Sequence, residues 1–278
     1  MEFENGHLVI LANQHAAIVQ IGQVAITWYG LAYAVGFAIG WSLLKTMMQR
    51  SNPPMTPDDD FGDLFFWCIL GVILGGRLGY ILFYGDIGYY RDNPIELIKI
   101  WQGGMSYHGG ALGVLIAVFL FGWADKVNPI RLLDYIVVVQ PAGQLLGRIA
   151  NFFNGELWGA PTDAPWGVIF RGADAIDTPR HPTQLYEAAA EGLLLFVILN
   201  LLFWKTDARL RPGLLSGLYV TLYAIFRFGI EFIRAPDAQL AGQTGALHMG
   251  QWLSLPMLAL GLALVSTGFI RPKITNTT

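Results

Sequence analysis

Long apolar runs alternate with short polar segments along most of this chain. Seven runs are each close to the roughly 20 residues that a helix needs to cross a bilayer core of about 30 Å. They lie at residues 25–44, 61–84, 107–124, 130–150, 186–204, 212–232 and 248–270. This pattern predicts an all-α polytopic membrane protein with about seven transmembrane helices.

The composition supports this interpretation. Hydrophobic residues make up 54% of the chain and charged residues only 13%, whereas soluble domains carry roughly 25% charged residues. The mean hydropathy is +0.47. Too little polar sequence remains between the apolar runs for a separate soluble domain, so we expect a single integral membrane domain over residues 1–278. The N-terminal segment lacks the features of a cleaved signal peptide, so we expect the first helix to target the chain.

Basic residues near the helix ends indicate the orientation of a membrane protein, because they concentrate on the cytoplasmic side. Nine lie on one side of the predicted helices: Lys45, Arg50, Lys126, Arg131, Lys205, Arg209, Arg211, Arg271 and Lys273. The other side has five, in longer loops: Arg91, Lys99, Arg171, Arg180 and Arg234. This asymmetry predicts an external N-terminus and a cytoplasmic C-terminus. Residues 151–185, the longest polar loop, then form a small extracytoplasmic cap, with a short strand expected at 166–170.

Two kinds of site are excluded by the cysteine and histidine pattern. A single cysteine, Cys68, lies inside an apolar run, so one chain cannot form a disulfide framework or a cysteine-based zinc site. Its apolar neighbours favour an unreactive, packed thiol. The spacing of the five histidines does not predict a metal site.

Polar side chains at membrane depth gather in the outer halves of the predicted helices. They are Tyr29, Arg77, His108, Arg148, Asn151, His181, Gln184, Glu187, Arg227, Glu231 and Gln251. The main exception is Asp134, at the inner start of the fourth helix. A charged side chain at mid-bilayer costs about 2.5–3.5 kcal/mol on insertion scales, so these groups need partners or a polar cavity. The densest stretch is Gly143–Gly159, which also contains Asn154 and Glu156.

The arginines in this group suggest an anionic ligand. The planar fork of arginine matches phosphate geometry, and phosphate at the depth of outer-leaflet headgroups indicates a phospholipid. The alternative is a network of ion pairs that only fixes the helices. Glu231 lies four residues after Arg227 on the same helix face, and Glu187 and Glu156 are available to the other arginines. Histidine and amide groups at the same level favour a ligand site.

His108 lies in the segment GGMSYHGG. Four glycines make a poor helix interior, so we expect a flexible or broken helix start that brings backbone close to a ligand. Histidine is the usual general base near neutral pH. Both a catalytic and a structural role for His108 remain open at this point.

Several motifs follow one another in a fixed order along the chain. They are WYGLAYAVGF (28–37), LGGRLGYILFY (74–84), GGMSYHGGALG (103–113), GRIANFFNGELWG (147–159), RHPTQLYEA (180–188), RFGIEFIRAPDAQ (227–239) and MGQWLSLPM (249–257). Together they resemble the prolipoprotein diacylglyceryl transferase family over nearly the whole chain. Ala150 stands where glycine is more usual, and alanine is also small.

The resemblance implies an integral protein of the bacterial cytoplasmic (inner) membrane that acts at the outer leaflet without metal or cofactor. Its implied reaction transfers the diacylglyceryl group of phosphatidylglycerol to the lipobox cysteine of a preprolipoprotein signal peptide. A thioether forms and glycerol-1-phosphate leaves, as the first step of bacterial lipoprotein maturation. The implied partners are this lipid, this peptide and the membrane, and not nucleic acid.

On this hypothesis, the candidate catalytic residues are His108, Arg148, Arg227 and Tyr29. The two arginines neutralise charge on the phosphate as the glyceryl C–O bond breaks. His108 takes the proton of the substrate thiol, and Tyr29 aids placement. The candidate substrate-binding residues are Arg148, Asn151, Asn154, Glu156, Arg227, Glu231, Arg77, His181 and Glu187.

Two other functional classes also place arginines inside a membrane protein. A transporter or channel for an anionic solute needs a polar path through the membrane, but the inner halves of these helices are apolar apart from Asp134. A scaffold held by internal ion pairs does not need the glycine-flanked His108 or the polar turn at 147–159.

Overall fold

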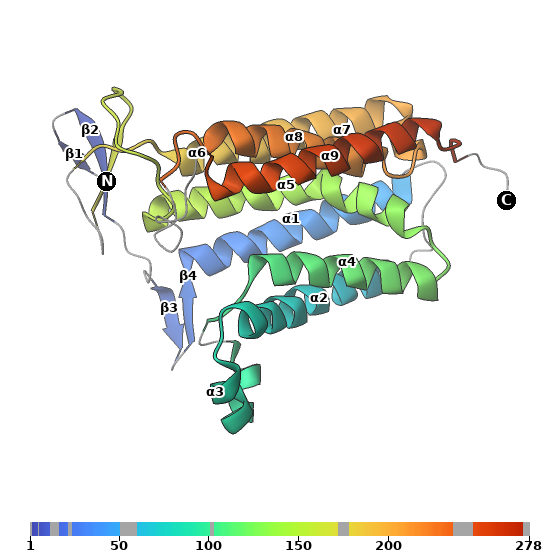
Figure 1. Cartoon of the computed structure of the whole chain (residues 1–278), viewed down its shortest axis with the longest axis horizontal. Helices are drawn as coiled ribbons and strands as arrows, with labels where there is room; N and C mark the ends of the chain where they lie inside the picture. Colours follow the sequence, from blue (N-terminus) through green and yellow to red (C-terminus); the bar gives the residue numbers. More distant parts are fainter. Residues whose placement is uncertain are drawn as a thin grey trace. The chain divides into compact units, whose positions relative to one another are not determined.

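A computed structural model of the chain (Figure 1) describes residues 2–4, 6–11, 17–21, 24–50, 60–100, 103–171, 178–235 and 247–274. Most of these residues are helical. The chain divides into two compact units. The first unit comprises Met1–Leu44 and Asp134–Thr275, and the second comprises Lys45–Leu133 and Asn276–Thr278.

Within the described residues, a helix lies in each apolar run predicted from the sequence, although some helices begin or end a few residues inside the run. The helices are α1 (Trp28–Arg50), α2 (Asp60–Phe83), α4 (Tyr107–Ala124), α5 (Pro129–Asn154), the continuous α6 (Thr183–Glu187), η3 (Ala188–Leu194) and α7 (Leu195–Lys205), α8 (Leu214–Ile230), and α9 (Met249–Ile270). Among the residues that the structure describes, four stretches are long and apolar enough to cross a membrane: Gly30–Arg50, Gly62–Phe83, Thr183–Lys205 and Met249–Ile270. His108–Ala124 and Leu214–Ile230 are shorter apolar helices.

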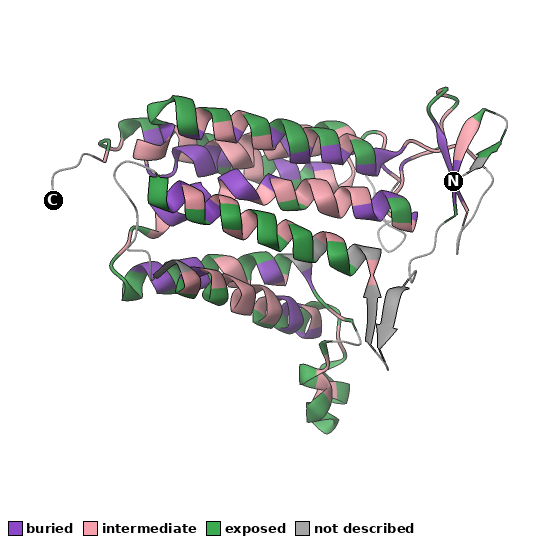
Figure 2. Ribbon diagram, turned by 180° about the vertical axis from the view of Figure 1, so that it is seen from behind, coloured by how far each residue is buried: buried purple, intermediate pink, exposed green. Residues whose placement is uncertain are grey.

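Large apolar side chains on these helices point away from the protein interior. Leu78, Trp123 and Leu260, on three different helices, are each more than half exposed. Figure 2 shows exposed positions running along the length of the helices. Helices that are apolar on their outer faces as well as their inner ones are typical of membrane proteins. The fold is therefore that of a mainly α-helical, multi-pass membrane protein.

The second unit is built on a close pair of helices, α2 and α4. A Cβ atom placed on Gly71 would lie 2.5 Å from the carbonyl oxygen of Gly113, and one on Gly75 would lie 2.3 Å from that of Gly109. Small residues at this spacing allow membrane helices to approach closely. In the sequence between these two helices lie the short α3 (Ile87–Asp92) and η1 (Pro94–Ile98).

The helices of the first unit also meet at small residues. A Cβ atom on Gly36 of α1 would lie 3.6 Å from Cα of Gly143 in α5. Gly192 of η3, a π-helical segment, packs on Leu145 of α5. Helices α5, α1 and the α6–α7 segment are therefore in close contact. A Cβ atom on Gly217 of α8 would lie 2.6 Å from the backbone nitrogen of Val265 in α9, so these two helices pack together as well.

A small sheet lies at the end of the first unit where α5 ends and α6 begins (Figure 1). Strand β1 (Glu2–Glu4) pairs antiparallel with β2 (His7–Leu11), and β2 pairs parallel with β5 (Val168–Arg171). Ile10, Phe152, Val168 and Phe170 form its buried core. β5 confirms the strand expected at 166–170.

The N-terminal strands were not predicted from the sequence. Besides β1 and β2, the segments β3 (Ala17–Ile21) and β4 (Val24–Thr27) form an antiparallel pair. The first predicted helix therefore began too early, because residues 24–27 are strand and α1 starts at Trp28. These short strands depend on pairing, and β2 finds its partner β5 far away in the sequence.

Asp134 caps a helix at the other end of the first unit. Its fully buried carboxylate accepts hydrogen bonds from the backbone N–H groups of Gly213 and Ser216, both at 2.7 Å, and from the Ser216 hydroxyl at 2.6 Å. Gly213 has φ +91° and stands at the N-cap of α8. Asp134 thus supplies the side-chain oxygens that this helix start lacks locally.

We expect Asp134→Ala to destabilise the first unit, because it leaves buried N–H groups at the start of α8 without an acceptor. The loss of unfolding free energy should be about 1–3 kcal/mol, measured as a lower thermal unfolding midpoint in detergent. Asp207→Ala is the control. Asp207 pairs with Lys273 at 2.7 Å but is 60% exposed, and equal effects of the two substitutions would contradict the capping role.

Candidate functional site

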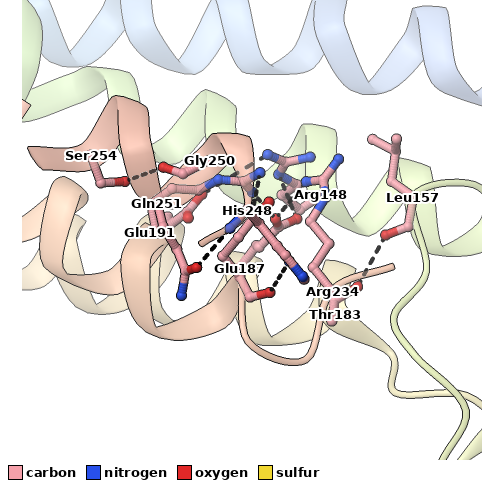
Figure 3. A network of polar contacts seen from close by, with 12 residues as sticks. Arg148, Leu157, Thr183, Glu187, Glu191, Arg234, His248, Gly250, Gln251 and Ser254 are labelled. Carbon is pink, nitrogen blue, oxygen red and sulfur yellow. Dashed lines mark hydrogen bonds and ion pairs between the residues drawn. The ribbon is translucent and has the colours of Figure 1, made fainter. Parts of the chain in front are cut away.

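The first unit contains a buried carboxylate, that of Glu187, surrounded by three guanidinium groups. Arg148 Nε lies 3.1 Å from Glu187 Oε2, while Arg227 Nη1 and Arg234 Nη1 lie 2.5 Å and 3.0 Å from Oε1. Figure 3 shows Arg148 and Arg234 converging on Glu187. A fully buried carboxylate is costly unless it is paired, and these contacts supply the pairing.

Two further carboxylates complete the cluster. Glu231 Oε2 lies 2.8 Å from Arg227 Nη2. Glu191 Oε2 lies 4.0 Å from Arg148 Nη2 and accepts a hydrogen bond from Gln144 Nε2 at 3.0 Å. With Glu187, these make three glutamates against three arginines, so the formal charges of the cluster balance. This balance lowers the cost of placing so many charges among apolar helices.

The arginines and the carboxylates are not equally accessible. The side chains of Arg148 and Arg227 are each 16% exposed, whereas those of Glu187 and Glu191 are 0% exposed. The carboxylates therefore lie behind the guanidinium groups. A guanidinium carries five N–H donors, so each arginine can keep its glutamate and still offer donors on the open side. An approaching ligand meets positive charge and hydrogen-bond donors, which is the arrangement that a phosphate requires.

Helix geometry explains how these side chains come together. Gln144 and Arg148 are four residues apart on α5, as are Arg227 and Glu231 at the end of α8, so each pair shares one face. The stretch from Glu187 to Glu191 runs from α6 into the π-helical η3. Single π turns are common at functional sites. Both glutamates are directed into the same buried cluster.

The polar turn after α5 folds on itself. Glu156 Oε1 accepts hydrogen bonds from Asn151 Nδ2 at 2.7 Å and from Asn154 Nδ2 at 3.2 Å. The Glu156 carbonyl accepts from Gln184 Nε2 at 2.6 Å. We expected Glu156 to pair with an arginine, but these amides are the partners that its carboxylate contacts. Gly155 has φ +67°, a conformation that glycine adopts without strain.

His181 lies at the start of the polypeptide that leads into α6. Its Nδ1 is 3.3 Å from the hydroxyl of Tyr186, which accepts a hydrogen bond from Trp166 Nε1 at 2.8 Å. The neighbouring Arg180 stacks over the ring of Trp158, 4.1 Å from its centroid. Burial lowers the pKa of Arg180 below its ordinary value. His181 is thus held by Tyr186 of α6, whose hydroxyl also binds Trp166 of the preceding loop.

Arg77 belongs to the second unit and binds backbone there. Its guanidinium donates hydrogen bonds to the carbonyls of Glu96 at 2.5 Å, Leu97 at 2.9 Å, Gly103 at 2.8 Å and Gly104 at 3.1 Å. Arg77 therefore organises the chain between η1 and α4. This is the segment that leads directly to His108.

His108 lies in the first turn of α4, where its side chain is exposed. Ser106 caps this helix by accepting a hydrogen bond from the Gly109 N–H at 3.2 Å. Gly103 and Gly104, just before the helix, have φ values of +90° and +77°, which glycine adopts without strain. The broken helix start expected from the glycines is not seen, because α4 is regular from Tyr107 onward. The side chain of Tyr29 lies outside the described residues, and His108 and the arginine cluster belong to different units.

Sequence reasoning missed Arg234, Glu191 and Gln144. Arg234 was counted as a loop residue, yet it is only 8% exposed and binds Glu187. The sequence did offer one indication: Arg234 follows Arg227 by seven residues, or about two helical turns. That spacing places both side chains on one face if the chain stays close to helical beyond the end of α8. Glu191 had a similar signal, four residues after Glu187. In the part of the chain that the structure describes, His, Cys, Asp and Glu side chains form no group suited to a metal ion.

Comparison with known proteins identifies the family. The family model described as prolipoprotein diacylglyceryl transferase matches residues 16–267. A relative from Zymomonas mobilis is 46% identical over 242 residues, covering 87% of this chain and 83% of its own. One from Rhodospirillum centenum is 47% identical over 245 residues, covering 88% of each chain. Both relatives are named phosphatidylglycerol–prolipoprotein diacylglyceryl transferase. The chain belongs to the prolipoprotein diacylglyceryl transferase family.

The family match extends over both compact units of this prolipoprotein diacylglyceryl transferase family member. It includes the arginine cluster of the first unit and the segment with Arg77 and His108 in the second. A relative from Ruegeria pomeroyi with the same name is 48% identical over 264 residues, covering 86% of this chain and 89% of its own. Family membership therefore rests on most of the chain and not on one motif.

We expect Glu187→Gln to be strongly destabilising, because it removes the carboxylate that three arginines share. Breaking a buried ion pair costs about 3–5 kcal/mol, which thermal or denaturant unfolding in detergent would detect. Glu4→Gln is the matched control, since Glu4 pairs with Arg171 while 46% exposed. Surface pairs contribute about 0–1 kcal/mol. Similar stability of the two variants would contradict a central role for Glu187.

Proposed function

We propose that this chain transfers the diacylglyceryl group of phosphatidylglycerol to the cysteine thiol of a prolipoprotein. The reaction forms a thioether and releases glycerol-1-phosphate, and it is the first step of bacterial lipoprotein maturation. The observation that carries the proposal is the cluster of partly open arginines, Arg148 and Arg227, backed by buried carboxylates in a member of this family. The names of the relatives, at 46–48% identity, agree with it.

The arginines bind the lipid phosphate in this mechanism. Arg148 and Arg227 keep their inner contacts with Glu187 and Glu231 while their outer N–H groups face the phosphate oxygens. Charge on the leaving phosphate grows as the glyceryl C–O bond breaks, and donors that are already in place stabilise it without rearrangement. Asn151 and Asn154 add amide groups at the edge of the same site.

The substrate thiol supplies the nucleophile. Its sulfur forms the new C–S bond at the glyceryl carbon, and the electron pair of the broken C–O bond leaves with glycerol-1-phosphate. A free thiol with a pKa of about 8.5 is only a few per cent thiolate at pH 7, so a base accelerates the step. We assign this role to His108, with Tyr29 aiding placement.

The remaining candidate residues act around these groups. Glu187, Glu231 and Glu156 hold the arginines or amides that contact the lipid. His181 shapes the loop at the entrance to α6. Arg77 acts through the backbone that it binds, because its guanidinium donates to the carbonyls of Glu96, Leu97, Gly103 and Gly104. No cofactor or metal has a part in the proposed reaction.

The proposed setting is the bacterial cytoplasmic (inner) membrane. On this proposal the chain is a single integral membrane domain with seven transmembrane helices, an external N-terminus and a cytoplasmic C-terminus. Residues 151–185 form an extracytoplasmic cap, and the site opens toward the outer leaflet, where a lipobox signal peptide arrives. The excess of basic residues at the predicted cytoplasmic ends of the helices supports this orientation. The alternative of a transporter or channel has no support among the relatives, which are transferases by name.

Purified protein should add one diacylglyceryl unit to a lipobox peptide in the presence of phosphatidylglycerol, as measured by mass spectrometry. Arg148→Ala and Arg227→Ala should each lower the rate by about 100-fold or more, as removal of a single oxyanion donor does. Arg209→Ala is the control, because Arg209 donates to the carbonyls of Phe203 and Thr206. A near-normal rate in either cluster variant would exclude the proposed phosphate site.

His108→Gln tests the general base. If His108 takes the thiol proton, the variant should be slower by about 100-fold. Raising the pH should restore part of its rate, because more of the substrate thiol is then ionised without a base. His7→Gln serves as a control for histidine replacement, since His7 contacts the carbonyl of Gly167 in the small sheet. An unchanged pH profile with a high rate would leave His108 a structural role.

A further inference from the structure

The start of α9, including its N-cap residue His248, contacts Glu231 at both its backbone and its side chain. His248 Nδ1 lies 3.2 Å from the backbone carbonyl of Glu231. The carboxylate of Glu231, at the other end of the residue, lies directly against Gly250. Figure 3 shows His248, Gly250 and Gln251 beside the arginine–glutamate cluster. The start of α9 therefore determines where this carboxylate can lie.

Glycine at position 250 leaves room for the Glu231 carboxylate, which any side chain there would occupy. A Cβ atom at this position would lie 2.5 Å from both Cδ and Oε2 of Glu231 and 2.8 Å from Oε1. All three distances are too short for non-bonded atoms. Glycine is a poor helix former, and Gly250 is the second residue of α9. The close approach of the Glu231 carboxylate gives a physical reason for glycine here.

A displaced Glu231 carboxylate would disturb Arg227. Glu231 Oε2 lies 2.8 Å from Arg227 Nη2, and Glu231 is only 6% exposed. The carboxylate therefore has little room to move while keeping this ion pair. Glu187 would still hold Arg227 Nη1, so the guanidinium would turn about that contact. Its outer donors would then point in a new direction.

We propose that Gly250 is a positioning residue for Arg227, acting through the Glu231 carboxylate. The inference rests on the proposed function, because it concerns the arginine that binds the lipid phosphate. It assigns Gly250 no contact with substrate. The obstacle to a side chain at 250 is the end of another side chain and not backbone, so Gly250→Ala folds with a misdirected guanidinium.

The experiment measures diacylglyceryl transfer by Gly250→Ala with phosphatidylglycerol and a lipobox peptide varied in turn. We expect kcat/KM for the lipid to fall by about 10- to 100-fold, since small misplacements of a positioning group have effects of this size. The KM for the peptide should stay near that of the natural sequence. A variant damaged throughout its fold would instead lose peptide binding and thermal stability as well.

A second substitution tests the route through Glu231. Glu231→Asp shortens the side chain and withdraws its carboxylate from Gly250. Adding Gly250→Ala to Glu231→Asp should then lower the rate by less than about threefold, because coupled residues respond non-additively. Gly229→Ala is the matched control. Gly229 is an exposed helical glycine close to Arg227, and a Cβ atom there meets nothing within 4 Å among the described residues, so its rate should not change.

Two results would overturn the inference: a Gly250→Ala rate equal to that of the natural sequence, or an equally large loss when Gly250→Ala is added to Glu231→Asp. If Gly250→Ala alone fails to fold, the comparison of Glu231→Asp with the double variant still tests the inference. Absence of product with the natural sequence would instead overturn the proposed function. In that case Gly250 is tested by lipid binding instead. Adding phosphatidylglycerol should raise the unfolding temperature of Gly250→Ala by less than that of Gly229→Ala, and equal increases would overturn the inference.

Discussion

The structure of the site depends on one buried carboxylate, that of Glu187. An ionised carboxylate among apolar helices is strongly unfavourable unless opposite charges and hydrogen bonds surround it. Arg148, Arg227 and Arg234 supply these charges from α5, from α8 and from the turn after α8. Each arginine needs a carboxylate for the same reason. The positions of these segments are therefore mutually dependent, and the charges are arranged before any ligand binds.

This arrangement also gives the cluster a buried side and an accessible side. The glutamates are buried more deeply than Arg148 and Arg227, so the guanidinium groups form the accessible side. Groups that are already oriented stabilise developing charge without reorganisation during the reaction. The start of α9 also helps to orient Arg227, because Gly250 leaves room for the Glu231 carboxylate that pairs with it. A residue without a side chain thus contributes to the orientation of a charged one.

Arg77 shows that an arginine at membrane depth can be accommodated differently. Its guanidinium contacts four backbone carbonyls and so organises the chain before α4. Arg148 and Arg227 contact carboxylates instead. The three residues look alike in the sequence, because each is a single basic residue within an apolar run. Only their partners distinguish an arginine that binds backbone carbonyls from one that pairs with buried carboxylates.

The sequence by itself determined the features that depend on local spacing and composition. The apolar runs predicted where the helices lie, the spacing of Arg227 and Glu231 predicted their ion pair, and the ordered motifs indicated the family. The tertiary structure decided which distant groups meet. It placed Glu187 between three arginines, brought Arg234 out of an apparent loop, gave Glu156 two amides as partners and paired β2 with β5. These contacts depend on the rotation and approach of whole helices, including the π-helical shift between Glu187 and Glu191, and a local sequence pattern does not encode that geometry.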